Sequence, residues 1–157
     1  MRPGVRVGVD VGKVRIGVAR SDPHGMLATP VETVARGSGD VERILAIAAE
    51  TDAMELIVGL PLSLAGTATA STDDATGFAS RLAGATTLPV RLVDERLSTV
   101  SAQSALRASG RSSRQSRPVI DQVAAVIIVQ HALDSERAAG TPPGEIAHPD
   151  EGQHDGR

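Results

Sequence analysis

The chain has 157 residues, enough for one domain that buries about 70% of the surface of its unfolded form. It contains one Phe and no Tyr, Trp or Cys, which excludes aromatic base-stacking platforms, disulfides, zinc-thiolate sites and thiol nucleophiles. The formal net charge is −3, but residues 134–157 hold six acids and two Arg, so residues 1–133 carry 14 basic and 13 acidic side chains, a balance of +1. No segment resembles a leader peptide or a membrane span, so the sequence predicts a cytoplasmic protein.

The N-terminal half predicts strands followed by a helix. Residues 5–11 are apolar at every second position, and residues 15–20 follow after a Gly-Lys turn, which predicts a β-hairpin. Residues 26–34 predict a third strand, placed at an edge or a bulge because Pro30 has no amide hydrogen to donate. Residues 40–51 begin with a capping Asp and are apolar at helical spacing, so they predict a helix.

The C-terminal half alternates strands and helices. Residues 55–59 form a short apolar run that predicts a buried strand, and a loop then leads to a helix over residues 71–82. Residues 90–94 predict another strand, and residues 98–109 predict a helix that ends at a Gly. The expected fold is α/β, with a mixed five-stranded sheet in the order 3-2-1-4-5 and helices on both faces.

The last part of the chain divides into three stretches. Residues 111–117 hold three Arg and predict an exposed, mobile basic loop, and residues 121–133 are apolar nearly all round, which predicts a helix packed on the sheet. Residues 138–157 are rich in Gly, Pro and acids and predict a disordered acidic tail. We therefore expect one domain over residues 1–137.

Acidic residues lie near the end of the first predicted strand, directly after the last one, and at the start of the last helix. Asp10 lies on the face of its strand opposite the valines, Glu95 follows the strand over residues 90–94, and Asp121 begins the apolar helix. Taken singly, each has an ordinary structural explanation: a turn, a solvated acid or a helix cap. Together, three carboxylates make the oxygen-rich site that Mg²⁺ or Mn²⁺ requires, and two such ions support in-line hydrolysis of a phosphodiester.

Four blocks of sequence resemble the YqgF (RuvX) family. They are Val9-Asp-Val-Gly-Lys13 with Arg15-Ile-Gly-Val-Ala-Arg-Ser-Asp22, Ile57-Val-Gly-Leu-Pro-Leu62 with Gly66-Thr67, Asp94-Glu-Arg-Leu-Ser-Thr99, and residues 121–130. The resemblance implies a ribonuclease H-like fold and a metal-dependent nuclease that processes the 5′ end of pre-16S rRNA; the family is also described as Holliday junction resolvases.

The resemblance also implies the roles of individual residues. Asp10, Glu95 and Asp121 match the three acids of the family and would be both catalytic and metal-binding. Residues expected to bind the nucleic acid are Lys13, Arg15, Ser63, Thr67, Arg96, Ser98, Thr99, Arg114 and Arg117.

Other functions are compatible with the same residues. The substrate would be structured precursor rRNA or branched DNA, since both offer backbone phosphates. A non-catalytic RNA-binding protein of ribosome assembly would keep the acids for metal-dependent folding. An actin-like phosphate binder is disfavoured, because it needs two domains and this chain has the length of one. No membrane partner is expected, and the sequence makes no prediction of monomer or dimer.

Overall fold

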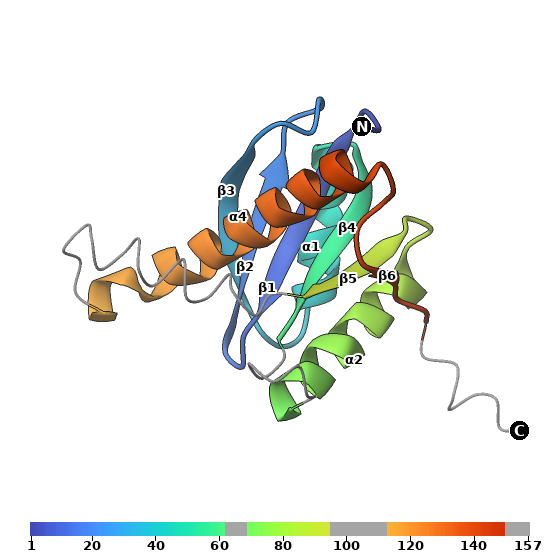
Figure 1. The fold of residues 1–157 in the computed structure, drawn as a ribbon. Coiled ribbons are helices and arrows are strands. Elements are labelled where there is room, and N and C mark those ends of the chain that lie inside the picture. The colour runs from blue at the N-terminus through green and yellow to red at the C-terminus, as the bar shows by residue number, and fades with distance from the viewer. Residues whose placement is uncertain (62–68, 95–112, 150–157) are drawn as a thin grey trace, which may run out of the picture.

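The computed structural model describes residues 1–61, 69–94 and 113–149, with side chains in the last range from residue 121 onward. Its elements are shown in Figure 1. In chain order they are β1 (Val5–Val11), β2 (Arg15–Ser21), β3 (Ala28–Ala35), α1 (Asp40–Glu50), β4 (Ala53–Leu60), α2 (Ala70–Ala85), β5 (Val90–Asp94), α4 (Ser113–Ala139) and β6 (Glu145–Ile146).

The strands form one mixed sheet in the order β3-β2-β1-β4-β5-β6. The first three strands pair antiparallel, whereas β4 lies parallel to both β1 and β5. This order confirms the predicted one and adds a sixth strand. Pro30 lies opposite Ala19 on the edge strand β3, at a shift in register, as a residue without an amide hydrogen requires.

Helices cover both faces of the sheet (Figure 1). On one face, the valines of β1 join Ile44 of α1 and Phe78 of α2 in the larger hydrophobic core. On the other face, α4 packs through Ala125, Ile128 and Val129. No helix among the described residues has an apolar stretch long enough to cross a membrane.

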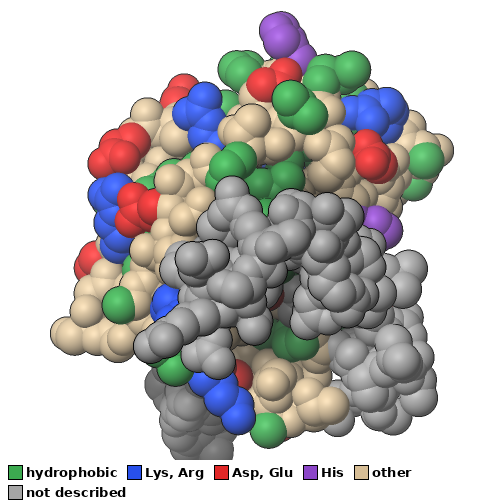
Figure 2. Space-filling model, turned by 90° about the vertical axis from the view of Figure 1, so that its left-hand side faces the viewer, with side chains coloured by type: hydrophobic (Ala, Val, Ile, Leu, Met, Phe, Trp, Pro, Cys, Tyr) green, Lys and Arg blue, Asp and Glu red, His purple; other side chains and the backbone are tan. Residues whose placement is uncertain are grey.

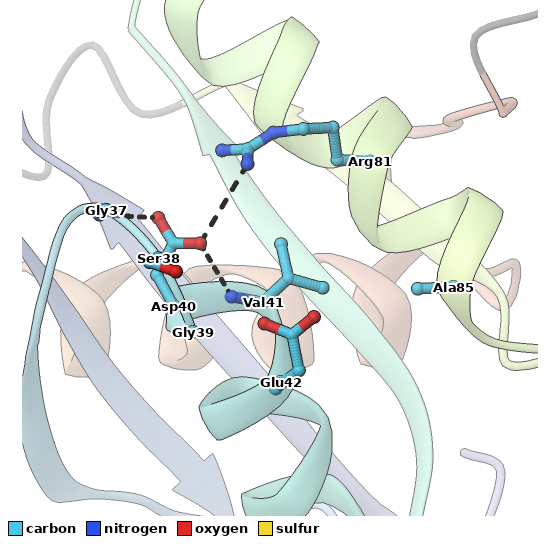
Figure 3. A pocket seen from close by; sticks show the side chains of 8 residues that line it. All are labelled: Gly37, Ser38, Gly39, Asp40, Val41, Glu42, Arg81 and Ala85. Atoms are coloured by element: carbon cyan, nitrogen blue, oxygen red, sulfur yellow. Dashed lines mark hydrogen bonds and ion pairs between the residues drawn. The ribbon is translucent and has the colours of Figure 1, made fainter.

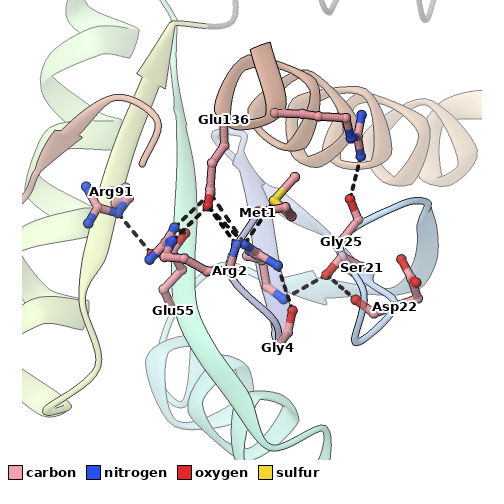
Figure 4. A network of polar contacts seen from close by, with 11 residues as sticks. Met1, Arg2, Gly4, Ser21, Asp22, Gly25, Glu55, Arg91 and Glu136 are labelled. Carbon is pink, nitrogen blue, oxygen red and sulfur yellow. Dashed lines mark hydrogen bonds and ion pairs between the residues drawn. The ribbon is translucent and has the colours of Figure 1, made fainter. Parts of the chain in front are cut away.

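A buried ionic network fastens the C-terminal end of α4 to the sheet (Figure 4). Glu136 accepts a hydrogen bond of 2.8 Å from Arg2 Nε and lies 3.4 Å from Arg6 Nη2. Glu55, on β4, binds both Arg2 and Arg91. Arg6 and Glu55 are fully buried, and Glu136 is 4% exposed. Hydrogen bonds from Arg2 lower the pKa of Glu136 to about 2, so this carboxylate is charged and holds α4 to Arg2 and Arg6.

The helix α4 begins earlier than the sequence predicts. Residues 113–117, expected as a mobile basic loop, are helical, so Arg114 and Arg117 belong to the first turns of α4. Arg and Gln are good helix formers, and the polarity that suggested a loop does not oppose a helix. Figure 1 shows these first turns projecting past β3.

The segment after α4 is also ordered, which corrects the prediction of a disordered tail for residues 138–149. The strand β6 pairs with β5, and the backbone N–H of Ala147 donates to Val90 O at 2.7 Å. Ala147 is buried in the larger core. Gly144 has a φ of +67°, and a side chain there would overlap Leu92 O. Composition alone misses this segment because its order comes from covering the open edge of β5. Residues 150–157 lie outside the described residues.

Charges on the β3 side of the molecule are mixed in sign. Figure 2 shows acidic and basic side chains next to one another over the described part of this face. Arg43, for example, contacts Glu32 at 2.7 Å and Glu50 at 3.5 Å. The stretch with the largest excess of Arg, residues 79–120, falls mostly in the part of the chain whose side chains are not described.

Candidate active site

The alternation of side chains along β1 places Asp10 on the face that α4 covers. Val5, Val7 and Val9 enter the larger core on the opposite face. Gly8 lies under α4, and a side chain there would overlap Val129. Because side chains two positions apart share a face of a strand, Asp10 follows Gly8 on the α4 side, half-buried near the carboxyl end of β1.

Gly17 brings Asp121 close to Asp10. In the antiparallel ladder, Gly17 of β2 is the direct partner of Asp10, and such partners have Cα atoms about 4.5–5.5 Å apart. On the α4 side, a Cβ atom at Gly17 would overlap the carbonyl group of Asp121. The helix therefore rests on the backbone of Gly17, and Asp121 lies one strand away from Asp10. Gln122 secures the contact by donating to Thr33 Oγ1 at 2.9 Å.

Arg15 holds the carboxylate of Asp121. Its Nε donates to Asp121 Oδ2 at 3.0 Å, and the side chains are 34% and 20% exposed respectively. Asp121 shares its stripe of α4 with the buried Ala124, Ala125 and Ile128, as the helical period predicts. Arg15, expected from the resemblance to bind substrate, is thus engaged with one of the candidate acids.

The turn between β1 and β2 lies directly beyond Asp10. The N–H of Gly12 donates to Arg15 O at 2.9 Å, and a Cβ atom at Gly12 would lie 2.7 Å from that oxygen, so the tight turn requires glycine. Lys13 and Val14 at its tip are exposed. Val14 is 67% exposed. The turn presents Lys13 to solvent three residues after Asp10.

Two residues near this turn had no signal in the sequence analysis. Arg36, which follows β3, contacts Asp74 of α2 and the carbonyl oxygen of Gly12. Arg36 is the main reason that the pKa of Asp74 is lowered, with smaller effects from Arg81 and Lys13. Neither residue belongs to a motif, and their partners are distant in sequence, so only the fold reveals them.

The remaining candidate residues are not brought together by the described part of the chain. Ser63, Thr67, Glu95, Arg96, Ser98 and Thr99 lie outside the described residues, as does the helix predicted over residues 98–109. Arg114 and Arg117 are described through the backbone of α4 alone. Strand β5 ends at Asp94, immediately before Glu95, and Val93 faces Ile128 of α4. Within the described ranges, no three acidic, His or Cys side chains form a group that could hold a metal.

A solved structure has the same arrangement of strands and helices. The structure of T. thermophilus RuvC in complex with Holliday junction substrate superposes with a TM-score of 0.55 at 16% identity, covering 89% of this chain and 99% of RuvC. This likeness, with the mixed sheet and the helices on both its faces, defines a ribonuclease H-like fold.

Sequence comparison identifies the family within that fold. The family model RuvX, described as Holliday junction resolvase, matches residues 4–135. A protein of Clavibacter michiganensis subsp. michiganensis named "Putative pre-16S rRNA nuclease" is 74% identical over 149 residues, 93% of this chain and 92% of that protein. A protein of the same name from Leifsonia xyli subsp. xyli is 60% identical, over 95% and 97% of the two chains. The chain belongs to the RuvX family and is a nuclease, a hydrolase that acts on nucleic acids.

Proposed function

We propose that this nuclease depends on divalent metal ions and processes the 5′ end of pre-16S rRNA. The proposal rests on the close approach of α4 to Gly17. The backbone of Asp121 lies against Gly17, and Gly17 is the direct partner of Asp10 in the neighbouring strand. The full-length similarity to proteins named as pre-16S rRNA nucleases supports the choice of substrate.

The donors near Gly17 suit Mg²⁺ or Mn²⁺. Asp10 and Asp121 supply carboxylate oxygens, which hard divalent cations prefer. Because Gly17 has no side chain, the backbone of Asp121 can approach the strand that pairs with Asp10. Arg15 contacts one carboxylate oxygen of Asp121 and fixes the orientation of that group. When bound, two such ions would activate water and neutralise charge on the attacking and leaving oxygens.

Glu95 is the third ligand in this proposal. Strand β4 separates β1 from β5, so the two strands are about 10 Å apart by ladder spacing. The residue of β4 that pairs with Val93 of β5 is Gly59, which has no side chain to fill the gap. Glu95 follows β5 directly and has one methylene more than an aspartate. The longer side chain of a glutamate suits the separation between β1 and β5, which is wider than that between the neighbouring strands β1 and β2.

The substrate would be held by cations and hydroxyls around the acids. Lys13, at the exposed tip of the β1–β2 turn, would meet a backbone phosphate. Arg114 and Arg117 belong to the first turns of α4, which lead into Asp121. We assign further contacts by resemblance to Ser63, Thr67, Arg96, Ser98 and Thr99.

The test is cleavage of a precursor-rRNA fragment in Mg²⁺ or Mn²⁺ by the wild type and by Asp10→Asn, Glu95→Gln and Asp121→Asn. Each substitution removes a charged ligand, so each should lower cleavage at least about a hundredfold while RNA binding changes much less. Asp134→Asn, an exposed aspartate of the same helix that pairs with Arg137, is the matched control and should cleave normally. Near-normal cleavage by all three folded variants would refute the metal site.

A Holliday junction is the second candidate substrate, favoured by the description of the family model. A four-way DNA junction, tested beside the RNA, distinguishes the two candidate substrates. The three acids do not contact the sugar, so a preference for RNA or DNA must come from the residues around them. Cleavage of the junction alone would replace rRNA processing as the function. Tight RNA binding without cleavage, unaffected by the amide substitutions, would indicate an assembly protein instead.

A further inference from the structure

Arg36 connects three elements beside the candidate site. Its Nη1 and Nη2 donate to the two carboxylate oxygens of Asp74 at 2.9 and 3.1 Å, a bidentate pair with α2. The same Nη1 donates to the carbonyl oxygen of Gly12 at 2.8 Å. The backbone N–H of Arg36 donates to Val14 O at 2.9 Å. One residue therefore binds the carbonyl groups on both sides of Lys13.

The guanidinium of Arg36 is itself fixed from two further directions. Its Nε lies 3.6 Å from Oδ2 of Asp40, and its carbon lies 5.5 Å from the centre of the Phe78 ring. Asp40 is buried and accepts hydrogen bonds from the backbone N–H groups of Gly37 and Val41, and it also pairs with Arg81 (Figure 3). Asp40 is thus a rigid partner at the start of α1.

We propose that Arg36, supported by Asp74, is a positioning residue of the nuclease site. It holds the β1–β2 turn in place and thereby fixes the positions of Asp10 and Arg15. This inference rests on the proposed function. Asp10 precedes Gly12 by two residues, and Arg15, which orients Asp121, follows Val14 directly. Movement of the turn would displace both acids relative to each other.

Arginine is the residue type that this position requires. Its planar guanidinium offers five N–H donors in fixed directions, and here they bind the carboxylate of Asp74 and the carbonyl group of Gly12, while the Asp40 carboxylate forms an ion pair 3.6 Å from Nε. A lysine ammonium has three donors at a single point and cannot span these acceptors. Arg36→Lys therefore keeps the positive charge and the backbone hydrogen bond to Val14 O, and removes the guanidinium contacts with Gly12 and Asp74.

The kinetic test compares Arg36→Lys and Asp74→Asn with the wild type on the precursor-rRNA fragment, well below the unfolding temperature. Arg36 is not assigned to the substrate, so kcat should fall about tenfold to a hundredfold while KM stays within about twofold. Arg43→Lys is the matched control, because Arg43 makes a similar bidentate pair with Glu32 away from the turn and should leave kcat unchanged. An unchanged kcat in folded Arg36→Lys would overturn the proposal.

A second measurement needs no cleavage. Amide hydrogen exchange at Gly12, whose N–H is bonded to Arg15 O, reports the rigidity of the turn. Exchange should be about tenfold faster in Arg36→Lys and unaltered in Arg43→Lys. Equal exchange in all three proteins would overturn the proposal. If the wild type does not cleave the precursor-rRNA fragment, the proposed function fails, and the exchange data still decide whether Arg36 holds the turn.

Discussion

At the scale of single residues, Gly17 is where the helix α4 and the sheet come closest. A methyl group there would overlap the carbonyl group of Asp121, so Gly17→Ala should destabilise the protein by about 1–3 kcal/mol and reduce cleavage by displacing Asp121. Urea unfolding and the cleavage assay measure the two effects. Gly77→Ala is the control: within the described part of the chain, no atom from outside its own helix lies within 4 Å of the Cβ position of this glycine, and alanine should stabilise by about 0.5–1 kcal/mol. Equal effects at both sites would contradict the close approach.

Glu136 makes the stability depend on pH. Its pKa falls from 4.5 to about 2 in the folded protein, chiefly through hydrogen bonds from Arg2. The unfolded chain therefore binds the proton more readily, and the stabilisation is fully present above about pH 4.5 and lost as the pH falls toward 2. Glu136→Gln should cost about 3 kcal/mol at pH 7 and little near pH 2, measured by urea unfolding at both pH values.

The exposed pair of Glu50 and Arg43 provides the comparison for Glu136. Glu50 is 63% exposed, and its contact with Arg43 is 3.5 Å long. Such pairs contribute about 0–1 kcal/mol, so Glu50→Gln should leave both the stability and its pH dependence nearly unchanged. Loss of the acid-sensitive stability in Glu50→Gln but not in Glu136→Gln would mean that the network around Arg2 is misassigned.

At the scale of elements, the segment over residues 140–149 has a structural role. Deleting residues 140–157 removes β6 and the buried Ala147 and uncovers the edge of β5, so we expect a loss of about 1–3 kcal/mol. Deleting residues 150–157 alone should change the free energy of unfolding by less than about 0.5 kcal/mol, given their polar composition. Thermal or urea unfolding of the two truncated proteins tests this boundary. A large loss from the shorter deletion, or none from the longer, would contradict it.

At the scale of the whole molecule, local periodicity predicted much of the fold. The two-residue period of β1 put Asp10 on the α4 face, and the helical period of α4 put Asp121 on its inward side. The strand order followed from short connections and a tight hairpin. These features depend on neighbours within a few residues, which a sequence shows directly.

Features that depend on distant partners were not predictable in this way. Arg36 binds Asp74, which is 38 residues away, and Arg2 binds Glu136, which is 134 residues away. The order of residues 140–149 comes from pairing with β5, which their composition does not indicate. The early start of α4 is not evident from composition, because its first residues are polar and yet form helix readily. Each case depends on a tertiary contact or on propensity overriding polarity.

The long reach of Arg2 has a consequence for synthesis of the chain on the ribosome. Because translation proceeds from the N-terminus, β1 emerges first, yet its partner β4 and its cover α4 are made much later. Until Glu136 has left the exit tunnel, the face of the sheet with Ala19 and Ile57 is uncovered and Arg2 and Arg6 lack an acid that they share in the native state. Incomplete chains of this kind expose apolar surface, to which chaperones bind. The native molecule is therefore completed only after α4 has left the exit tunnel.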